Sequence, residues 1–199
     1  MTKIHRLPAI LAAGLIALAA ISGCGRKAES ELETLIDKVV QKDFKAGSGV
    51  WAPIDYSVIP QLQPYGEEAI AALMAALDDC PKHVQPSYST VITLINAEPA
   101  RFEACKKLLN HPNNEVRKDA VEGFVGEGAP DEAIELCISL ISESEDSGVR
   151  CVALYALRYC KNAKFHARIC KAFRSATADT NQMVREHAFR SLDQAKFCR

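Results

Sequence analysis

The 199-residue chain lacks the common sequence signatures of catalysis and of metal binding. It has no Cys-x-x-Cys pair and no tight group of histidines, although zinc sites generally depend on such close spacing. A glycine-rich phosphate-binding loop and a nucleophile elbow are also absent. A net charge of −1 does not by itself indicate a strongly charged partner, and aromatic residues make up only 7% of the chain. We therefore predict no catalytic residues and no metal site.

Two weaker arrangements are the alternatives to this prediction. His166 and Cys170 are four residues apart (170 − 166), which places both on one side of a helix, but no further metal ligand accompanies them. Cys151 and a distant histidine could in principle act as a nucleophile and its base. The sequence supplies no additional group that would support either site.

What the chain does contain is a repeated phrase, Val-Arg-x-x-Ala. It occupies Val116–Ala120, Val149–Ala153 and Val184–Ala188, at steps of 33 and 35 residues (149 − 116 and 184 − 149). Repetition at such a period is typical of similar units stacked side by side. Three positions before each valine stands a residue that can cap a helix, and apolar residues continue after the valine at intervals of four. The capping residues are Asn113, Asp146 and Asn181. Each phrase therefore predicts a capped, amphipathic α-helix.

A second set of equivalent positions extends the repeat towards the amino terminus. These positions lie in apolar helical stripes and are separated by 32, 32 and 33 residues: Leu73, Cys105, Cys137 and Cys170. A degenerate copy of the phrase begins at Val84, with Gln85 in the place of the arginine. One step further back, Pro53 and Pro60 permit only a short or irregular first helix. The array is thus predicted to begin with an atypical unit, as repeat arrays usually do.

With these features the chain resembles the HEAT-like helical repeats, in their short bacterial form, over residues 51–199. The resemblance implies an all-α fold, an α-solenoid or armadillo-type superhelix of about four antiparallel helix pairs. In that family the repeated arginine commonly lies at the seam between repeats and hydrogen-bonds backbone or acidic groups. This implies a structural role for Arg117, Arg150 and Arg185.

The helix that follows the phrase with Arg150 departs from the repeat pattern. Its apolar stripe slips by a few positions, to Phe165, Ile169 and Phe173, and Arg174 stands where the preceding unit predicts an apolar residue. We therefore expect irregular packing between the last two units.

The first 23 residues are typical of an export signal. Lys3 and Arg6 are followed by an apolar run of 15 residues (7 to 21), which suits a signal peptide core better than a membrane span. The run ends in Ile21-Ser22-Gly23-Cys24, which resembles a bacterial lipobox. The resemblance implies that residues 1–23 are removed and that Cys24 carries covalent lipid, three acyl chains, with no other cofactor. Because Gly25 gives no retention signal, we expect attachment to the outer membrane of a bacterial cell envelope, facing the periplasm. An ordinary secretory signal and an uncleaved anchor are the alternatives.

Residues 24–50 are predicted to form a short lipid tether and an amphipathic cap helix. Ser30 and Glu33 have the spacing of a capping box, and apolar residues follow at helical spacing from Leu32 to Val39. We expect this helix to cover the apolar end of the first repeat, with residues 46–49 as a flexible link after it. The alternative is a helix lying on the lipid surface, although its polar face lacks the cationic excess typical of such helices.

Charge is distributed unevenly along the chain. Counting Lys and Arg against Asp and Glu, the net charge is −4 for residues 24–97 (6 − 10), −7 for residues 98–147 (5 − 12) and +8 for residues 148–199 (11 − 3). A solenoid keeps residues that are distant in sequence apart in space, so the carboxyl-terminal end should carry a positive field. We predict there a docking surface for an unidentified protein with an acidic face. The candidate residues are Arg158, Lys161, Lys164, Arg168, Lys171, Arg174 and Arg190. The alternative is that these cations are solvated and complement the acidic units before them.

Eight cysteines are many for a chain of this size. One is assigned to lipid, and the remaining seven cannot all pair within the chain. Cys105, Cys137 and Cys170 should stand a helix-packing distance apart, which exceeds disulfide reach, so we predict three free thiols in the core. Of the other four, Cys160 and Cys198 fall near the ends of successive phrase helices and form the preferred disulfide. Cys80 and Cys151 are the alternatives as partners.

The favoured function is that of a membrane-anchored scaffold or adaptor, which holds a partner protein through an extended face of its repeats. An immunity-type inhibitor of a toxin is a second candidate within the binding class. An enzyme or enzyme subunit is the alternative from another class, because similar short repeats occur in lyases that attach bilin chromophores to phycobiliproteins. The export signal and the scarcity of aromatic residues argue against that role, and the export signal also disfavours nucleic acid as a partner.

Overall fold

The structure, a computed structural model, describes residues 24–40, 52–125 and 129–198, with side chains from residue 31 onward. The predicted signal peptide (residues 1–23) and the predicted link (residues 46–49) lie outside the described residues. Within the described ranges the secondary structure is helical, apart from one isolated β-bridge between Val40 and Ile54. None of the described helices combines the length and the apolar character needed to cross a bilayer.

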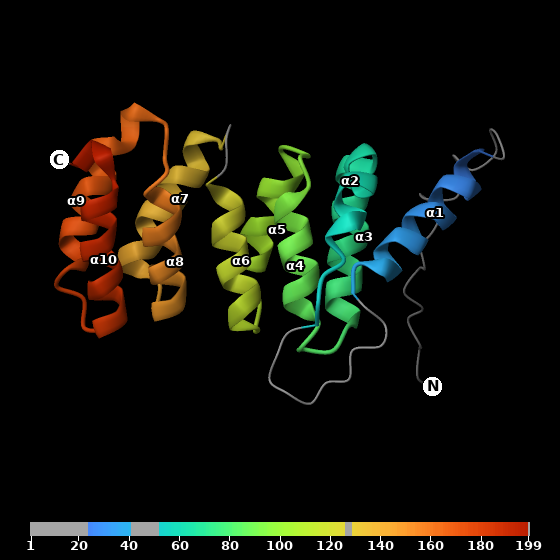
Figure 1. Ribbon diagram of the computed structural model, residues 1–199, viewed down its shortest axis with the longest axis horizontal. Coiled ribbons are helices and arrows are strands. Elements are labelled where there is room, and N and C mark those ends of the chain that lie inside the picture. The colour runs from blue at the N-terminus through green and yellow to red at the C-terminus, as the bar shows by residue number, and fades with distance from the viewer. Residues whose placement is uncertain (1–23, 41–51, 126–128, 199) are drawn as a thin grey trace, which may run out of the picture.

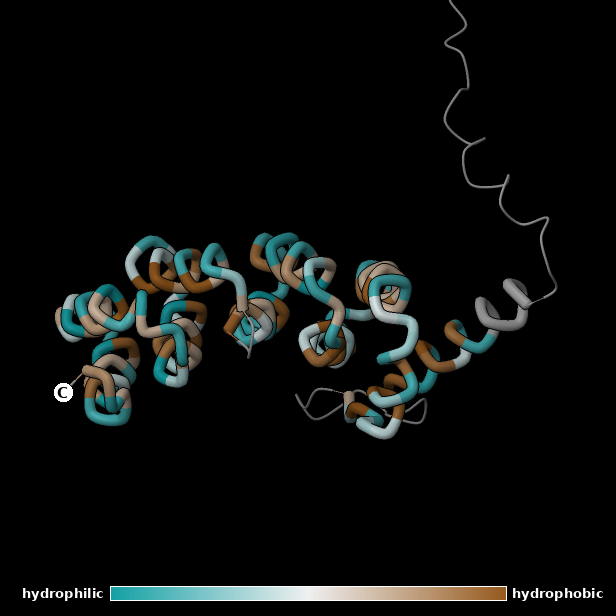
Figure 2. The backbone as a smooth tube through the Cα atoms, turned by 90° about the horizontal axis from the view of Figure 1, so that it is seen from above, coloured by the Kyte–Doolittle hydropathy of each residue, from teal (hydrophilic) through white to brown (hydrophobic). Residues whose placement is uncertain are grey.

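Eight helices make up two layers, which Figure 2 shows as two rows along the array. One layer contains α3 (Gly66–Asp79), α5 (Ala100–Leu108), α7 (Asp131–Glu143) and α9 (His166–Ala176). The other contains α4 (Gln85–Leu94) and the three helices that carry the repeated phrase, α6 (Asn114–Phe124), α8 (Ser147–Leu157) and α10 (Gln182–Gln194). Within this second layer α4 packs against α6, α6 against α8, and α8 against α10.

The resemblance to HEAT-like repeats implied that each phrase helix is the first helix of its antiparallel pair, but in the structure it is the second. Of its neighbours in the other layer, each phrase helix packs most closely on the one that precedes it, which gives the pairs α3/α4, α5/α6, α7/α8 and α9/α10 (Figure 1). The turn between α7 and α8 has only three residues, 144–146, so these two helices are held directly together. A longer connection separates α6 from α7, and these helices contact each other less.

The repeated phrase builds its helices as predicted. The side chains of the three capping residues accept hydrogen bonds from backbone N–H groups of the first turns: Asn113 from Glu115 at 3.1 Å, Asp146 from Gly148 at 2.8 Å and Asn181 from Met183 at 2.9 Å. The valine and alanine of every phrase are buried, and one continuous apolar core runs from α1 to the end of α10. The slipped stripe of α9, Phe165, Ile169 and Phe173, is also fully buried, while Arg174 is exposed.

The amino-terminal end carries the predicted cap helix, α1 (Cys24–Lys38). Leu32, Leu35, Ile36 and Val39 are buried, and α1 packs against α2 (Ile59–Leu62) and α3. This apolar face is therefore covered by protein. The start of α1 differs from the expectation in two ways. The helix begins six residues before Ser30, so residues 24–30 are helical and do not form an extended tether. Ser30 therefore lies inside the helix and not at its start, where a capping box would stand. Because a helix rises about 1.5 Å per residue, these six steps span about 9 Å.

The first repeat is irregular, as the prolines predicted. It consists of the 3₁₀ turn η1 (Tyr56–Val58), the four-residue α2, in which Pro60 occupies the first turn, and the 3₁₀ turn η2 (Gln63–Tyr65). Val58 and Leu62 are buried and join this segment to the core. The array thus begins with α1 and this short segment, and it ends with α9 and α10 at the opposite end (Figure 1).

Candidate partner-binding site

The phrase arginines lie at the seams, which we define as the boundaries between successive helices of the phrase-bearing layer. At the α6/α8 seam Arg117 donates to Asp146 at 2.6 Å and to the His111 carbonyl at 2.8 Å. At the α8/α10 seam Arg150 donates two hydrogen bonds to Asp179, both at 2.9 Å. Such two-point contacts between a guanidinium and a carboxylate are strong and directional.

Arg185 stands after the last seam and binds only backbone. It donates to the carbonyls of Asp179 at 2.7 Å and Thr180 at 3.0 Å. Burial alone would raise the pKa values of Asp146 and Asp179, but hydrogen bonds from Arg117 and Arg150 and from backbone N–H groups outweigh it and lower both. The contacts of Arg117 and Arg150 hold neighbouring units together, which is the structural role that the resemblance implied.

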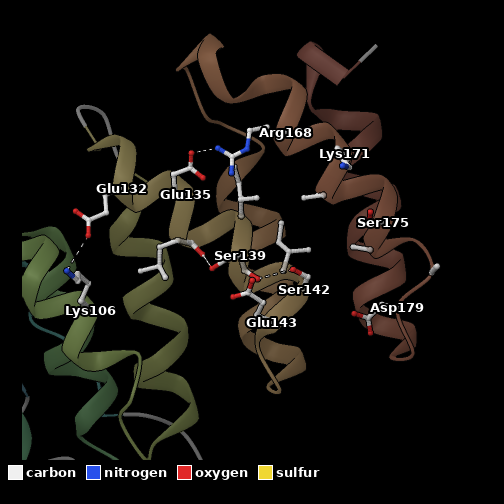
Figure 3. A pocket seen from close by; sticks show the side chains of 16 residues that line it. Lys106, Glu132, Glu135, Ser139, Ser142, Glu143, Arg168, Lys171, Ser175 and Asp179 are labelled. Atoms are coloured by element: carbon white, nitrogen blue, oxygen red, sulfur yellow. Dashed lines mark hydrogen bonds and ion pairs between the residues drawn. The ribbon is translucent and has the colours of Figure 1, made fainter.

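A hollow lies in the other layer, between α7 and α9. It is a groove of about 900 Å³. Its lining residues are Lys106, Glu132, Glu135, Leu136, Ile138, Ser139, Ile141, Ser142, Glu143, Arg168, Lys171, Ala172, Ser175, Ala176, Ala178 and Asp179. Figure 3 shows α7 and α9 as its two walls. Between these helices the side chains of Ser139, Ser142, Ala172, Ser175 and Ala176 are short, which leaves the groove open.

Charged groups stand at both ends of this groove. At one end Arg168 of α9 pairs with Glu135 of α7, and Lys106 of α5 lies 3.5 Å from Glu132 (Figure 3). Lys171 is exposed and makes no ion pair with a carboxylate of the described residues. At the other end lie the acidic Glu143 and Asp179, the latter already bound by Arg150 (Figure 3). The groove therefore combines an apolar floor with charge of both signs.

The seven predicted partner-binding cations are not gathered on one surface. Arg168 and Lys171 line the groove, and Lys164 pairs with Asp131 at 2.6 Å. Lys164 and Arg168 thus pair with acidic residues of α7. For these two cations this agrees with the alternative prediction, in which they complement the acidic unit before them. Arg174 and Arg190 are exposed and make no ion pair with a carboxylate among the residues described. Arg158 lies in the other layer, beside α10, and Lys161 is exposed after α8.

The predicted disulfide between Cys160 and Cys198 is wrong. Cys198 pairs with Cys170, at a Cα–Cα distance of 5.4 Å, and Cys160 is a buried free thiol. The reason is that the chain does not continue beyond α10 in the direction of the helix. It turns at Ala195 into the 3₁₀ turn η4 (Lys196–Cys198), which packs on the outer side of α9.

The prediction of a free thiol at Cys170 therefore fails as well, while Cys105 and Cys137 are free and buried as expected. Burial raises the pKa of Cys105 to about 12 and that of Cys137 still further. Both are thus protonated, unreactive core residues. Among the described residues no group of three or more histidine, cysteine or acidic side chains is arranged to hold a metal ion.

Sequence reasoning did not identify the groove or the exposed tyrosines of α8. The groove depends on where α9 comes to rest beside α7, which one-dimensional patterns do not specify. A signal was nevertheless present in the small residues at matching positions of the two helices, since Ala172 and Ser175 follow Ser139 and Ser142 by 33 residues (172 − 139 and 175 − 142). Tyr155 of α8 and Tyr159, which follows directly after that helix, were visible in the sequence as an aromatic pair four residues apart.

No protein-family model matches the chain, and no curated protein matches it in sequence. Its fold is similar to that in the structure of the complex of CpcE and CpcF of phycocyanin lyase from Nostoc sp. PCC7120, with a TM-score of 0.60 and 19% identity, over 82% of this chain and 98% of that chain. A designed armadillo repeat protein in complex with the peptide (KR)4 matches with a TM-score of 0.45 and 18% identity, over 87% of this chain and 77% of that chain. At these identities the similarity concerns the fold alone. The chain is thus an all-α helical-repeat solenoid of the HEAT and armadillo-like type.

Proposed function

We propose that the protein is a membrane-tethered scaffold or adaptor that binds a partner protein in the groove between α7 and α9. The observation that carries this proposal is the groove itself, about 900 Å³ with an apolar floor and charged ends. A polypeptide matches this combination, since it can place an apolar side chain on the floor and pair its polar groups with Lys171 and Glu143. Protein interfaces commonly have such an apolar centre and a polar rim.

The structural neighbour supports a binding role without specifying the partner. It is a structure of a complex between two proteins, CpcE and CpcF. A solenoid presents a long surface for its size, because each unit contacts only its neighbours and leaves its outer sides open. A catalytic role forms no part of the proposal, because the similarity to lyase proteins is one of fold alone. A bilin absorption band in the visible spectrum of the purified protein would favour the lyase-related alternative.

We further propose that the protein is exported and anchored in a bacterial cell envelope by lipid on Cys24. The sequence Ile21-Ser22-Gly23-Cys24 supports this proposal. Since α1 lies at the opposite end of the array from α9 and α10, the anchor would hold the groove away from the membrane (Figure 1). Several acyl chains stabilise attachment strongly, at about 0.8 kcal/mol for each buried CH₂ group. Cys24→Ala should release the protein into the soluble fraction, and unchanged membrane retention would refute lipid anchoring.

The groove is best tested by filling it. Ser175 is exposed and lines the groove, so Ser175→Trp should block it without removing a core side chain. Ala167 is exposed on α9 and does not line the groove, which makes Ala167→Trp the matched control. We expect crosslinking in intact cells, followed by affinity purification, to recover a complex with the wild type and with Ala167→Trp.

Ser175→Trp should reduce the recovered complex by about tenfold or more, as expected for a blocked interface centre. Charge reversal at Lys171 should weaken it too, while reversal of the exposed Lys107 on α5 should not. Full recovery with Ser175→Trp would show that the partner binds elsewhere. If the purified partner proves to be a toxin, the immunity-type role becomes the specific form of this function.

A further inference from the structure

A strip of side chains on the phrase-bearing layer does not follow the repeat. Six residues after the phrase valine stand Glu122, Tyr155 and Arg190 (116 + 6, 149 + 6 and 184 + 6), and all three are exposed. Their helices, α6, α8 and α10, pack side by side, so equivalent positions lie next to one another across the layer. The exposed strip therefore changes from acidic to aromatic to basic. A position that varies while its neighbours repeat is free of the scaffolding role and available for recognition.

The aromatic part of this strip is a tyrosine pair joined to an arginine. Tyr155 and Tyr159 are 45% and 64% exposed, and their rings meet edge to face with centroids 5.7 Å apart. The guanidinium of Arg158 lies 4.4 Å from the centre of the Tyr155 ring and also hydrogen-bonds Gln194 of α10. These contacts hold the three side chains in place although they face solvent. Fixed tyrosine and arginine side chains supply much of the binding energy at protein interfaces, because little conformational entropy remains to be lost.

The two arginines of this region, Arg158 and Arg190, make no ion pair with a carboxylate of the described residues. Arg158 binds a neutral amide. By contrast, Lys106, Lys118 and Lys164 each lie within 4 Å of a carboxylate, as do the seam arginines Arg117 and Arg150.

His187 also reports the positive field of this region. Its pKa is lowered by burial and then by Arg158 and Arg190, so the imidazole is neutral. Its Nδ1 atom is buried and has no hydrogen-bond partner among the described residues. Around His187 the two arginines therefore outweigh the nearby Glu186.

We propose that Tyr155, Arg158, Tyr159 and Arg190 form a second docking surface, for an acidic protein segment that carries a large apolar side chain beside its carboxylates. The guanidinium groups of Arg158 and Arg190 can donate hydrogen bonds to carboxylates, and the tyrosine rings beside Arg158 provide an apolar platform. Glu186 and Asp193 are also exposed on α10, so a short segment that contacts only the arginines and tyrosines fits better than an extended anionic membrane surface, which would meet these acids as well. This surface lies on the layer opposite the groove, so the two sites can be occupied independently.

An array of short synthetic peptides of random sequence tests the proposal directly. The fluorescently labelled protein, from residue 24 onward, should bind preferentially to peptides in which Asp or Glu stands next to Leu, Phe or another large apolar residue. Peptides with Lys in place of the acid, or Ala in place of the apolar residue, should bind at least about tenfold more weakly. Binding should also weaken as the salt concentration rises, since exposed charges are screened.

Variants locate the binding on the protein. Tyr155→Ala and Arg190→Glu change exposed side chains, and each should reduce the binding of the selected peptides at least about tenfold. The matched controls are Tyr56→Ala, an exposed tyrosine at the other end of the array, and Arg174→Glu, an exposed arginine of α9. Circular dichroism would verify that each variant is folded.

Three outcomes would overturn the proposal: no preference for acidic peptides, undiminished binding by Arg190→Glu and Tyr155→Ala, or cosedimentation with phosphatidylglycerol vesicles in the absence of peptide binding. Ser175→Trp should leave peptide binding unchanged. The experiments can therefore refute partner binding in the groove and peptide binding at this surface separately.

Discussion

The seams at the two ends of the phrase-bearing layer are held together by different forces. At the α4/α6 seam Gln85 stands in the place of the phrase arginine, and its Oε1 accepts a hydrogen bond of 3.1 Å from the Asn113 amide. At the α8/α10 seam Arg150 binds Asp179 through two charged hydrogen bonds, and these two side chains are only 11% and 13% exposed. The α6/α8 seam has the same type of ion pair, Arg117 with Asp146, at 25% and 19% exposure.

The α4/α6 seam makes up for its missing ion pair by close approach. A Cβ atom placed on Gly123 of α6 would lie 2.7 Å from the Cys105 sulfur and 2.8 Å from Thr93. The equivalent positions of α8 and α10, seven residues after the phrase valine, carry the larger Ala156 and Ser191 (149 + 7 and 184 + 7). One repeat geometry is therefore stabilised in two ways, by packing at the amino-terminal seam and by paired charges at the carboxyl-terminal ones.

The largest expected effect on stability comes from replacing the charged contact of the α8/α10 seam by a neutral one, like that of Gln85 at the α4/α6 seam. Arg150→Gln should lower the free energy of unfolding by about 3 kcal/mol, because Asp179 is left as a largely buried carboxylate without this cation and the Ser144 carbonyl loses its donor. Unfolding in urea, followed by circular dichroism, measures the loss. The same change at the more exposed Arg117 should cost about 1 to 2 kcal/mol.

Gln85→Ala provides the reference for this comparison. It removes one neutral hydrogen bond at the α4/α6 seam and should cost about 1 kcal/mol. Equal losses for Gln85→Ala and Arg150→Gln would mean that the ion pair adds nothing beyond a neutral contact, and the contrast between the seams would then be geometric only.

The second largest expected effect comes from a substitution that disturbs the close packing at the α4/α6 seam. Gly123→Ala should destabilise the protein by about 2 kcal/mol, because the new methyl group meets Thr93 Cβ at 3.1 Å as well as the Cys105 sulfur, and neither side chain can easily move away. Thermal and urea unfolding both measure this loss.

Gly148→Ala is the matched control for that substitution. Its nearest new neighbour is Cε of Lys118 at 2.7 Å, near the mobile end of a long side chain. Both glycines lie in helices, so both substitutions gain helix propensity of up to about 1 kcal/mol. Gly148→Ala should therefore be neutral or slightly stabilising, and an equal loss at both positions would contradict the packing argument.

The sequence predicted the parts of this fold that depend on local physics. The caps Asn113, Asp146 and Asn181 and the buried valine and alanine of the phrase follow from helix periodicity and from backbone groups left free at helix starts. The irregular first repeat follows from Pro53 and Pro60 in the same way. Each of these features is decided within a few residues of chain, so a periodic pattern suffices to identify it.

Features that depend on how distant segments meet were predicted poorly. The prediction of a disulfide between Cys160 and Cys198 failed because the turn at Ala195 brings Cys198 back onto α9, and no spacing along the chain reveals this turn. Charge counting correctly found a basic end, but it did not show that Lys164 and Arg168 reach across to the acidic α7. It also missed the groove, whose shape depends on the distance between two helices.

The smallest expected effect is a difference between the seams in how their contribution to stability depends on pH. Burial raises the pKa of Asp119, at the α4/α6 seam, from its ordinary value of 3.8 to about 6, although Ser89 and Thr90 donate hydrogen bonds to the carboxylate. The folded protein therefore binds more protons than the unfolded chain between about pH 4 and 6, and this contribution to stability is lost as the pH rises through that range. Asp119→Asn should thus match the wild type near pH 4 and exceed it by about 1 to 2 kcal/mol at pH 7.

Asp146 and Asp179, at the other seams, behave oppositely, since their lowered pKa values give stability that is lost on acidification. Unfolding of the wild type and Asp119→Asn between pH 4 and 7 measures the first trend, and unfolding of the wild type and Asp146→Asn as the pH falls below about 4 measures the second. If the Asp119→Asn difference does not grow from pH 4 to pH 7, the carboxyl is not desolvated in the folded protein. The α4/α6 seam would then be more open to water than its packing around Gly123 indicates.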